Sequence, residues 1–262
     1  MKVTRTGYYR YLLTREKNKD KELIEKIRNI FHRHKRRYGS RRIKKELERQ
    51  GLVISKKKIR EIMEEQGMTP VQRRKYKATT NSNHRYPVAN NLVKGLNIQR
   101  LNQVWVSDIT YIATEEGWLY LATILDMYTR EIVGYSMSER IDTDLVLNAL
   151  EKAVKKYRPK DLIIHSDRGV QYASKRYQER LKKHKITCSM SAKGNPYENA
   201  NMESFNSTIK KELVYVRGRK YITRHIARTE IFEYIEIYYN KERLHSSIGY
   251  MTPYECRLKQ AV

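Results

Sequence analysis

Three carboxylates, far apart in the chain, have the surroundings expected for metal-dependent chemistry on phosphate esters. Asp108 lies inside the apolar run VWVSDITYI, where a charged side chain is costly unless it is paired or binds a cation. Asp167 follows the apolar run DLIIHS beside a glycine-containing turn, a usual place for functional groups on open α/β sheets. Glu203 lies one turn inside a segment with helical character. Three oxygen ligands suit Mg²⁺ or Mn²⁺, and two such ions can activate a water or a 3′-hydroxyl for displacement at phosphorus.

Each carboxylate also has a purely structural interpretation. Asp108 could be a buried hydrogen-bonded residue, Asp167 a turn residue and Glu203 a solvated helix residue, so only the combination favours a metal site. Glu198, five residues before Glu203, lies about 140° away around a helix, so a site facing one side of that helix would use only one of the two.

Other candidates for chemistry are weaker. Asp126 ends a predicted strand and is interpreted as a turn residue. His165 and Ser166 are adjacent in a strand, so their side chains point to opposite faces and do not form a nucleophile–base pair. The two cysteines, Cys188 and Cys256, have neither disulfide nor zinc spacing with each other or with histidines. The 21 tyrosines lack the arginine-rich setting of a tyrosine recombinase and are expected to pack or to stack on DNA.

The elements that must position the three carboxylates follow from hydrophobic periodicity. Three successive antiparallel strands are predicted over 104–112, 118–126 and 131–138, and shorter strands over 161–166 and 186–190. Helices are predicted over 143–157, 174–185 and 199–214. The order β-β-β-α-β-α-β-α predicts an α/β fold, a ribonuclease H-like mixed five-stranded sheet with flanking helices, in which the first and fourth strands are neighbours. A last helix, 224–240, and a polar, aromatic tail follow.

A small all-helical region precedes this core. A helix is predicted from Lys21 to about Arg36, and two short helices follow, one capped by Ser40 and ended by Gly51, the other capped by Ser55. This is the outline of a helix-turn-helix, and a plain helical hairpin fits the pattern equally well. The basic residues expected to project from the two short helices toward DNA are Arg41, Arg42, Lys44, Lys45, Lys56, Lys57, Lys58 and Arg60.

The charge distribution points to a polyanionic partner. The chain has 262 residues and a formal charge of +26, of which residues 1–100 carry net +20 and the remainder +6. Such a surface binds phosphates through counterion release. The aperiodic basic stretch 70–92, with Arg73, Arg74 and Lys75, is expected to be a linker that also contacts DNA. No run is apolar enough for a membrane span or a signal core, so we expect a cytoplasmic, nucleoid-associated protein.

These motifs together resemble a known family. The stretches YGSRRIKKEL, NQVWVSDITYI, LDMYTREIVGY, HSDRGVQYAS, SMSAKGNPYENANMESFNSTIKKEL and YYNKERLHSSIGYMTPYE resemble the DDE-type transposases of bacterial insertion sequences, specifically the second-frame (OrfB) product of the IS-three family, which shares its catalytic core with retroviral integrases. Asp167 and Glu203 are separated by 35 residues, the spacing of that group, and Lys210 stands seven residues after Glu203, where the family has a basic residue.

The resemblance implies roles for these residues. Asp108, Asp167 and Glu203 match the family's catalytic and metal-binding carboxylates, and Lys210 matches a residue that holds phosphate near the metals. Glu198 stands where the family usually has aspartate, and we interpret it as a helix cap with a DNA-facing role. The implied function is binding of terminal inverted repeats, cleavage and 3′-OH strand transfer with two Mg²⁺ or Mn²⁺ ions; a catalytically idle DNA-binding regulator and a nuclease without strand transfer are the alternatives.

The resemblance also implies partners and a domain plan. The partners are double-stranded DNA of the element ends and of the target, a homo-oligomer of at least two subunits and, through frameshifting, the upstream-frame product. The predicted boundaries are a helix-turn-helix region over 1–69, a basic linker over 70–100, a catalytic core over 101–215, and a C-terminal helix and tail over 216–262 that pack on the core.

Overall fold

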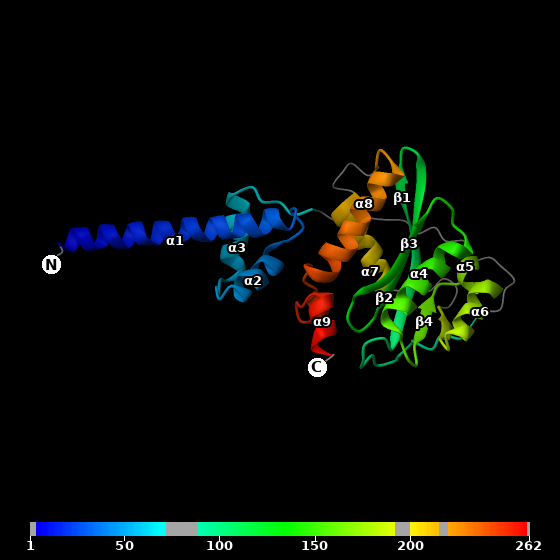
Figure 1. Ribbon diagram of the computed structural model, residues 1–262. Coiled ribbons are helices and arrows are strands. Elements are labelled where there is room, and N and C mark those ends of the chain that lie inside the picture. Colours follow the sequence, from blue (N-terminus) through cyan, green and yellow to red (C-terminus); the bar gives the residue numbers. More distant parts are fainter. Residues whose placement is uncertain (1–3, 72–88, 192–199, 215–219, 261–262) are drawn as a thin grey trace. The chain divides into compact units, whose positions relative to one another are not determined.

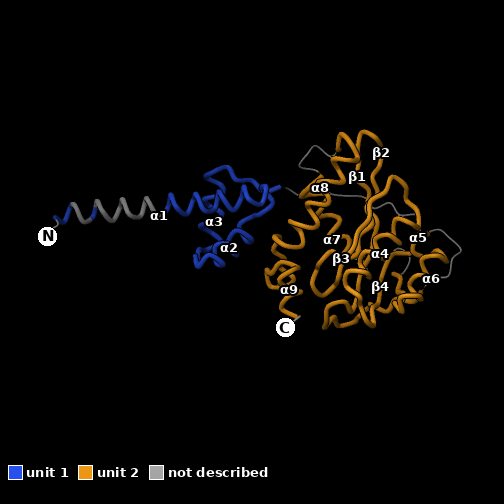
Figure 2. The backbone as a smooth tube through the Cα atoms, viewed as in Figure 1, with its two compact units in different colours: residues 1–72 blue, residues 73–262 orange. Residues whose placement is uncertain are grey.

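The computed structural model describes residues 4–71, 89–191, 200–214 and 220–260. Figure 1 shows the elements along the chain. The chain divides into two compact units, residues 1–72 and residues 73–262 (Figure 2), and the division falls inside the predicted linker. Within the described ranges, no helix is both long and apolar enough to cross a bilayer.

The first unit is a three-helix arrangement. It consists of α1 (Arg5–Arg33), α2 (Ser40–Arg49) and α3 (Lys56–Glu65). Their apolar faces meet in a core that includes Ile27, Phe31, Ile43, Leu47 and Ile59. The short α2–α3 connection turns at Gly51, whose φ of +78° is a conformation that glycine adopts without strain. The predicted pair of short helices is therefore present.

Two details of this unit differ from the sequence prediction. The first helix begins at Arg5 rather than Lys21, because residues 14–22 contain no apolar side chain and the apolar repeat that starts at Leu23 therefore does not extend back to the helix start. Gly39, not Ser40, occupies the N-cap of α2, and Ser40 is its first helical residue. Ser55 caps α3 as predicted, since its hydroxyl accepts a hydrogen bond from the Lys58 amide at 3.1 Å.

The second unit confirms the predicted fold class. Its strands are β1 (Val104–Thr114), β2 (Gly117–Asp126), β3 (Ile132–Ser138), β4 (Ile163–Ser166) and β5 (Thr187–Met190). They form one sheet in the order β3-β2-β1-β4-β5; β1, β2 and β3 pair antiparallel, and β4 runs parallel to both β1 and β5. The first and fourth strands are neighbours, as predicted.

Helices cover both faces of the sheet (Figure 1). The helices between the strands and after them are α4 (Thr143–Tyr157), α5 (Val170–Ala173), α6 (Lys175–Lys183), α7 (Ala200–Ile209) and α8 (Arg224–Glu233). One face packs on α4, α5 and α6 through a core that includes Trp105, Ile124, Leu150, Ile164 and Tyr177. Helix α7 contacts β1, and α8 contacts β1 and β2. At the tightest point of the α4 layer, a Cβ on Gly134 of β3 would lie 2.5 Å from the Ala149 carbonyl oxygen.

Helices α7 and α8 continue as wider π-helical turns. Lys210–Val214 (η2) follows α7, and Tyr234–Tyr239 (η4) follows α8. The polar, aromatic tail contains the 3-10 turn Ser246–Ile248 (η5) and a further helix, α9 (Pro253–Lys259). Thr252, Pro253 and Glu255 form a capping box with proline at the first turn, a signal that the sequence contains and that the prediction missed.

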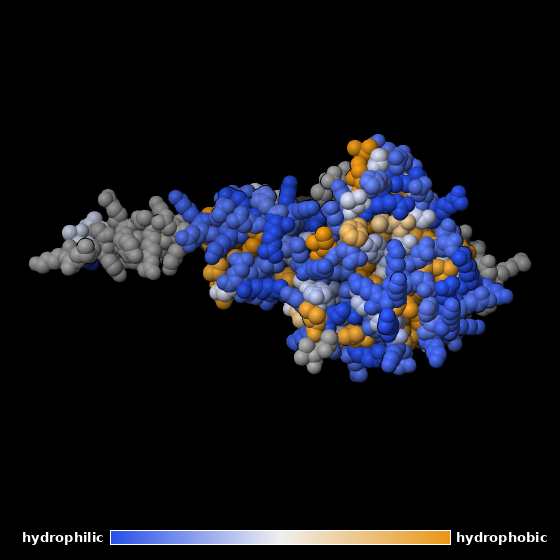
Figure 3. All heavy atoms as spheres, viewed as in Figure 1, coloured by the Kyte–Doolittle hydropathy of each residue, from blue (hydrophilic) through white to orange (hydrophobic). Residues whose placement is uncertain are grey.

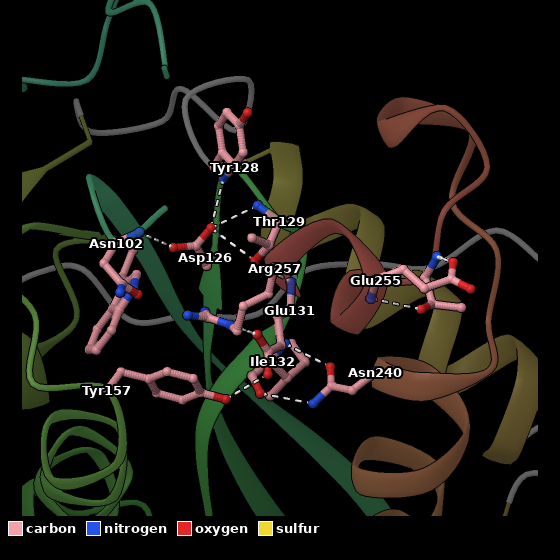
Figure 4. Close-up of polar contacts among 12 residues, drawn as sticks. Asn102, Asp126, Tyr128, Thr129, Glu131, Ile132, Tyr157, Asn240, Glu255 and Arg257 are labelled. Atoms are coloured by element: carbon pink, nitrogen blue, oxygen red, sulfur yellow. Dashed lines mark hydrogen bonds and ion pairs between the residues drawn. The ribbon is translucent and has the colours of Figure 1, made fainter. Parts of the chain in front are cut away.

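The C-terminal segment packs on the connection between β2 and β3, as Figure 4 shows. The Asn240 side chain donates to the Ile132 carbonyl and accepts from its amide, both at 3.0 Å. Arg257 of α9 pairs with the buried Glu131, whose other carboxylate oxygen accepts from the Tyr157 hydroxyl at 2.6 Å. Residues more than a hundred positions apart thus join the C-terminal helices to the sheet.

Candidate active site

The two aspartates lie side by side where the pairing of two parallel strands ends. The last registered pair between β1 and β4 is Ser107 with Ser166; Asp108 is the next residue of β1, which continues to Thr114, and Asp167 directly follows β4. Side chains alternate between faces along a strand, so the two aspartates share one face. Ser107 faces the opposite layer, where its hydroxyl lies 2.9 Å from the Tyr172 hydroxyl of α5. The two carboxylates therefore converge on the face that α7 covers.

Asp108 is oriented by a hydrogen bond from α7, and its surroundings disfavour its ionised form. Its Oδ2 accepts a hydrogen bond from Asn206 Nδ2 of α7 at 2.7 Å. Burial raises the pKa of Asp108 from 3.8 to about 7; the negative charge of Asp167 also raises it, and Glu203 adds a smaller effect. The Ile109 amide and the charge of Lys210 act in the opposite direction. The negative charges of Asp167 and Glu203 thus make ionisation of the partly buried Asp108 carboxyl less favourable.

Asp167 is oriented by the turn that follows β4. Its Oδ1 accepts a hydrogen bond from the Gly169 amide at 2.9 Å. A Cβ on Gly169 would lie only 3.0 Å from the same oxygen, so a larger residue would crowd the carboxylate. The glycine in this turn therefore permits the close approach of backbone and carboxylate.

Glu203 lies on the exposed side of α7. The opposite side of this helix is anchored in the unit by the buried side chains of Met202, Phe205 and Ile209. Arg130, from the β2–β3 connection, donates a hydrogen bond to Asn201 in the first turn of α7. Among the residues with described positions, no group of three His, Cys, Asp or Glu side chains is arranged to hold a metal ion. Asp167 and Glu203 are thus in electrostatic range of Asp108, although the described residues form no closed ligand set.

Lys210 is buried beside the carboxylates. Its side chain is only 5% exposed, and its Nζ lies 4.5 Å from the centroid of the Tyr111 ring. Burial lowers the pKa of Lys210 to about 8, and the charge of Asp108 opposes this effect. The ammonium group therefore faces the acidic site from the helix that carries Glu203.

Asp126, the last residue of β2, has a structural role. Its carboxylate is fully buried and accepts hydrogen bonds from the backbone amides of Asn102, Tyr128 and Thr129, and from the Thr129 hydroxyl (Figure 4). His165 and Ser166 point to different partners, Ser189 and the Asp167 carbonyl respectively, as expected for adjacent strand residues.

The basic residues of the helical hairpin lie at its surface, and much of the face visible in Figure 3 is hydrophilic there. Arg41, Lys56, Lys57, Lys58 and Arg60 are exposed, whereas Arg42, Lys44 and Lys45 are partly exposed. Several of these residues form ion pairs with acidic side chains, as Lys45 does with Glu48 at 2.7 Å. Arg73, Arg74, Lys75 and Glu198 lie outside the described residues.

Sequence reasoning missed one polar residue of the site, Asn206. It follows Glu203 by three residues, so the two lie on adjacent turns of one helix face, and its amide contacts Asp108 directly. The E-x-x-N spacing was the available signal.

Comparison with known proteins identifies the family. Models of an integrase core domain match residues 99–196 and 184–253, and a helix-turn-helix-like domain matches residues 17–76. The chain is 37% identical over 260 residues to the transposase InsF for insertion sequence IS3A of Escherichia coli, covering 97% of this chain and 90% of the relative. The chain belongs to the IS3 family of insertion-sequence transposases.

Further similarities agree with this assignment. The transposase is 42% identical to a 31 kDa protein of insertion element IS600 of Shigella sonnei, over 98% of this chain and 96% of that protein. It is also 42% identical to the transposase for insertion sequence element IS904 of Lactococcus lactis, over 88% of this chain and 91% of that protein. A simian T-cell lymphotropic virus intasome shares the fold of the transposase, with a TM-score of 0.51 and 15% identity over 78% of this chain and 66% of that chain.

Proposed function

We propose that Asp108, Asp167 and Glu203 are the catalytic carboxylates of this transposase and that they bind divalent metal ions. The main support is the electrostatic strain at Asp108, whose pKa rises to about 7 because of burial and the nearby charges of Asp167 and Glu203. A cation placed among these groups would offset the repulsion between them. Since all of the donors are carboxylate oxygens, Mg²⁺ or Mn²⁺ is the fitting ion, and we propose two of them.

The proposed reaction is cleavage of one DNA strand at the element end, followed by attack of the freed 3′-OH on another phosphodiester. Bound ions would supply activation of the attacking oxygen and stabilisation of the leaving oxygen. Asn206 would hold the Asp108 carboxylate toward the site, and the Gly169 amide would do the same for Asp167. The buried Lys210 ammonium would add positive charge where the phosphate enters.

The helix-turn-helix-like unit would bind the terminal inverted repeats. Its exposed basic residues, together with the basic stretch that includes Arg73, Arg74 and Lys75, supply the positive charge for phosphate contacts. The transposase would act as an oligomer of at least two subunits, because two element ends must be joined, and its upstream-frame product would take part as a frameshift fusion.

A strand-transfer assay tests this proposal. Labelled inverted-repeat DNA is incubated with the full chain, alone and as the fusion, with and without Mg²⁺, and Asp167→Asn is the critical variant. We expect Mg²⁺-dependent joined products from the wild type and their loss in the variant, with DNA binding retained. Joining by Asp167→Asn would refute the proposed mechanism. Binding without cleavage in the wild type would favour the regulator, and nicking without joining would favour the nuclease.

A further inference from the structure

A buried ion pair joins the end of α7 to the C-terminal segment. Glu212 lies in the π-helical turn η2, directly after α7, and Arg243 lies after η4. Arg243 Nε is 3.0 Å from Glu212 Oε2, and Arg243 Nη2 is 2.8 Å from Glu212 Oε1, so the guanidinium engages both carboxylate oxygens. The side chains are 7% and 5% exposed. The contact is therefore a bidentate, buried ion pair with a fixed geometry.

Neighbouring aromatic rings extend this contact along α7. The Tyr234 hydroxyl donates to Glu212 Oε2 at 2.9 Å. Tyr239, from the same C-terminal segment as Arg243, packs on α7: its ring centroid is 4.9 Å from that of Phe205 and 5.6 Å from the Arg243 guanidinium carbon. Phe205 lies on the side of α7 opposite Glu203, so the C-terminal segment contacts both the buried side of the helix that carries the proposed catalytic glutamate and the end of that helix.

The contact with Glu212 stabilises the charged form of the Arg243 guanidinium. Burial by itself would lower the pKa of Arg243, but the Glu212 charge and its hydrogen bonds outweigh burial and raise it. Buried ion pairs contribute little net stability compared with apolar residues of similar size, because both charges lose their hydration. Their directional geometry fixes the position of the groups that carry them, which is a reason to look for a positional role.

The position of η2 matters because Lys210 is its first residue. A π-turn is wider than an α-turn and is stable only where neighbouring groups support it. If the π-helical turn η2 changed to an α-helical turn, the Lys210 ammonium would move away from the Tyr111 ring and from the Asp108 carboxylate, which it now faces. Asn206 would still tie the middle of α7 to β1, so the helix would stay attached while its end moved.

We propose that Glu212 and Arg243 are positioning residues that set the end of α7 and thereby place Lys210 and Glu203 toward Asp108. This inference rests on the proposed function, since it assigns the pair a role in that reaction. The C-terminal segment would then be part of the catalytic apparatus, although neither residue of the pair touches the reacting atoms.

The chain offers a matched control in the Arg257–Glu131 pair (Figure 4). Arg257 also comes from the C-terminal segment, Glu131 is also buried, and it also accepts a tyrosine hydroxyl, from Tyr157. This second pair anchors the β2–β3 connection instead of α7. Loss of either pair should disturb folding in a similar way, whereas only loss of the first should disturb the site.

The experiment compares two double variants in the full-length transposase. Glu212→Gln with Arg243→Met removes both charges of the first pair and leaves an acceptor for Tyr234, and Glu131→Gln with Arg257→Met does the same for the second. Tm, affinity for inverted-repeat DNA, the rate of joining at saturating DNA and the Mg²⁺ concentration for half-maximal joining are measured for both. Arg243→Lys, which keeps the charge but loses the two-pronged contact, is a milder variant.

We expect the first double variant to lose about 10- to 100-fold in joining rate and to need more Mg²⁺, as for residues that orient metal-binding groups. Its DNA affinity should be unchanged, and Arg243→Lys should show a smaller change in the same direction. The control variant should match it in Tm and keep a near wild-type Mg²⁺ requirement.

Equal effects of the two double variants on joining and on Mg²⁺ requirement would overturn the inference. So would failure of both Glu212–Arg243 variants to fold at the assay temperature, because the pair would then be a stability determinant. The parallel Asp167→Asn assay separates the two proposals: if that variant joins DNA, the proposed function fails, and if it is inactive while the two double variants behave alike, only the positioning role fails.

Discussion

Replacing Asp108 by asparagine is predicted to stabilise the metal-free transposase while removing its joining activity. The carboxyl of Asp108 is partly buried and lies in range of the charges of Asp167 and Glu203, so that its pKa rises from 3.8 to about 7. Asparagine has nearly the same shape and no charge, and its side-chain oxygen can accept the hydrogen bond that Asn206 now donates at 2.7 Å.

The sign and size of the effect follow from proton linkage. Between about pH 4 and pH 7 the folded protein binds a proton at Asp108 that the unfolded chain does not, so stability falls as pH rises through this window and levels off above it. A rise of roughly three pKa units corresponds to at most about 4 kcal/mol at pH 8. Solvent screening of the partly exposed group reduces this to roughly 2 kcal/mol.

Thermal unfolding in EDTA at pH 8 and at pH 5 measures the difference between Asp108→Asn and the wild type. For a protein of this size, roughly 2 kcal/mol corresponds to a Tm increase of about 4–8 °C at pH 8. At pH 5 the increase should be smaller, because folded wild-type Asp108 is then largely protonated and only the interval between about pH 4 and pH 5 still contributes to the difference. A Tm at pH 8 equal to or below that of the wild type would refute this account of the site.

Asp126→Asn is the matched control for this measurement. The Asp126 carboxylate is also buried, but it accepts hydrogen bonds from three backbone amides and one hydroxyl. Replacing it with asparagine removes the charge that these donors stabilise, and should lower Tm at pH 8. Tm changes of opposite sign for Asp108→Asn and Asp126→Asn would show that the surroundings of each aspartate, and not the residue type, determine the change in stability.

Two further predictions concern packing and DNA binding. Gly134→Ala should destabilise the protein by about 1–3 kcal/mol in chemical denaturation, because its Cβ would lie 2.5 Å from the Ala149 carbonyl oxygen and 2.7 Å from the Ala153 Cβ; an unchanged denaturation midpoint would contradict the tight packing of α4 on β3. Arg41→Ala should weaken binding to all DNA sequences alike and lower the slope of log affinity against log salt by about 1, as measured by fluorescence anisotropy. Lys45→Ala should have less effect, because Lys45 is already paired with Glu48 at 2.7 Å; equal effects of the two substitutions would argue against the exposed arginine as a phosphate contact.

The sequence by itself determined the order of the five strands and of most of the helices. Runs rich in β-branched and aromatic residues marked β1 to β3, helical spacing marked α4 and α8, and Ser55 and Gly51 marked ends of the short helices. This order makes β1 and β4 neighbours, which brings Asp108 and Asp167 side by side. These features are local or follow from strand order, so the linear pattern contains them.

The early start of α1 and the presence of α9 show where helix prediction from hydrophobic periodicity fails. In α1, residues 14–22 contain no apolar side chain and interrupt the apolar repeat, and α9 was not recognised in a polar, aromatic stretch despite its capping box. Periodicity reports a helix only when one face is buried along its length, whereas caps and intrinsic propensity leave a weaker signal.

Only the tertiary structure decided what surrounds each side chain. The contact of Asn206 with Asp108, the burial of Lys210 against Tyr111, and the Glu212–Arg243 pair join residues that are distant in sequence. Periodicity states which face of an element a residue occupies, but not which partner meets it across the interface. The pKa of a carboxyl depends on that partner and on exclusion of water, so the unusual electrostatics of Asp108 appeared only once the chain was folded.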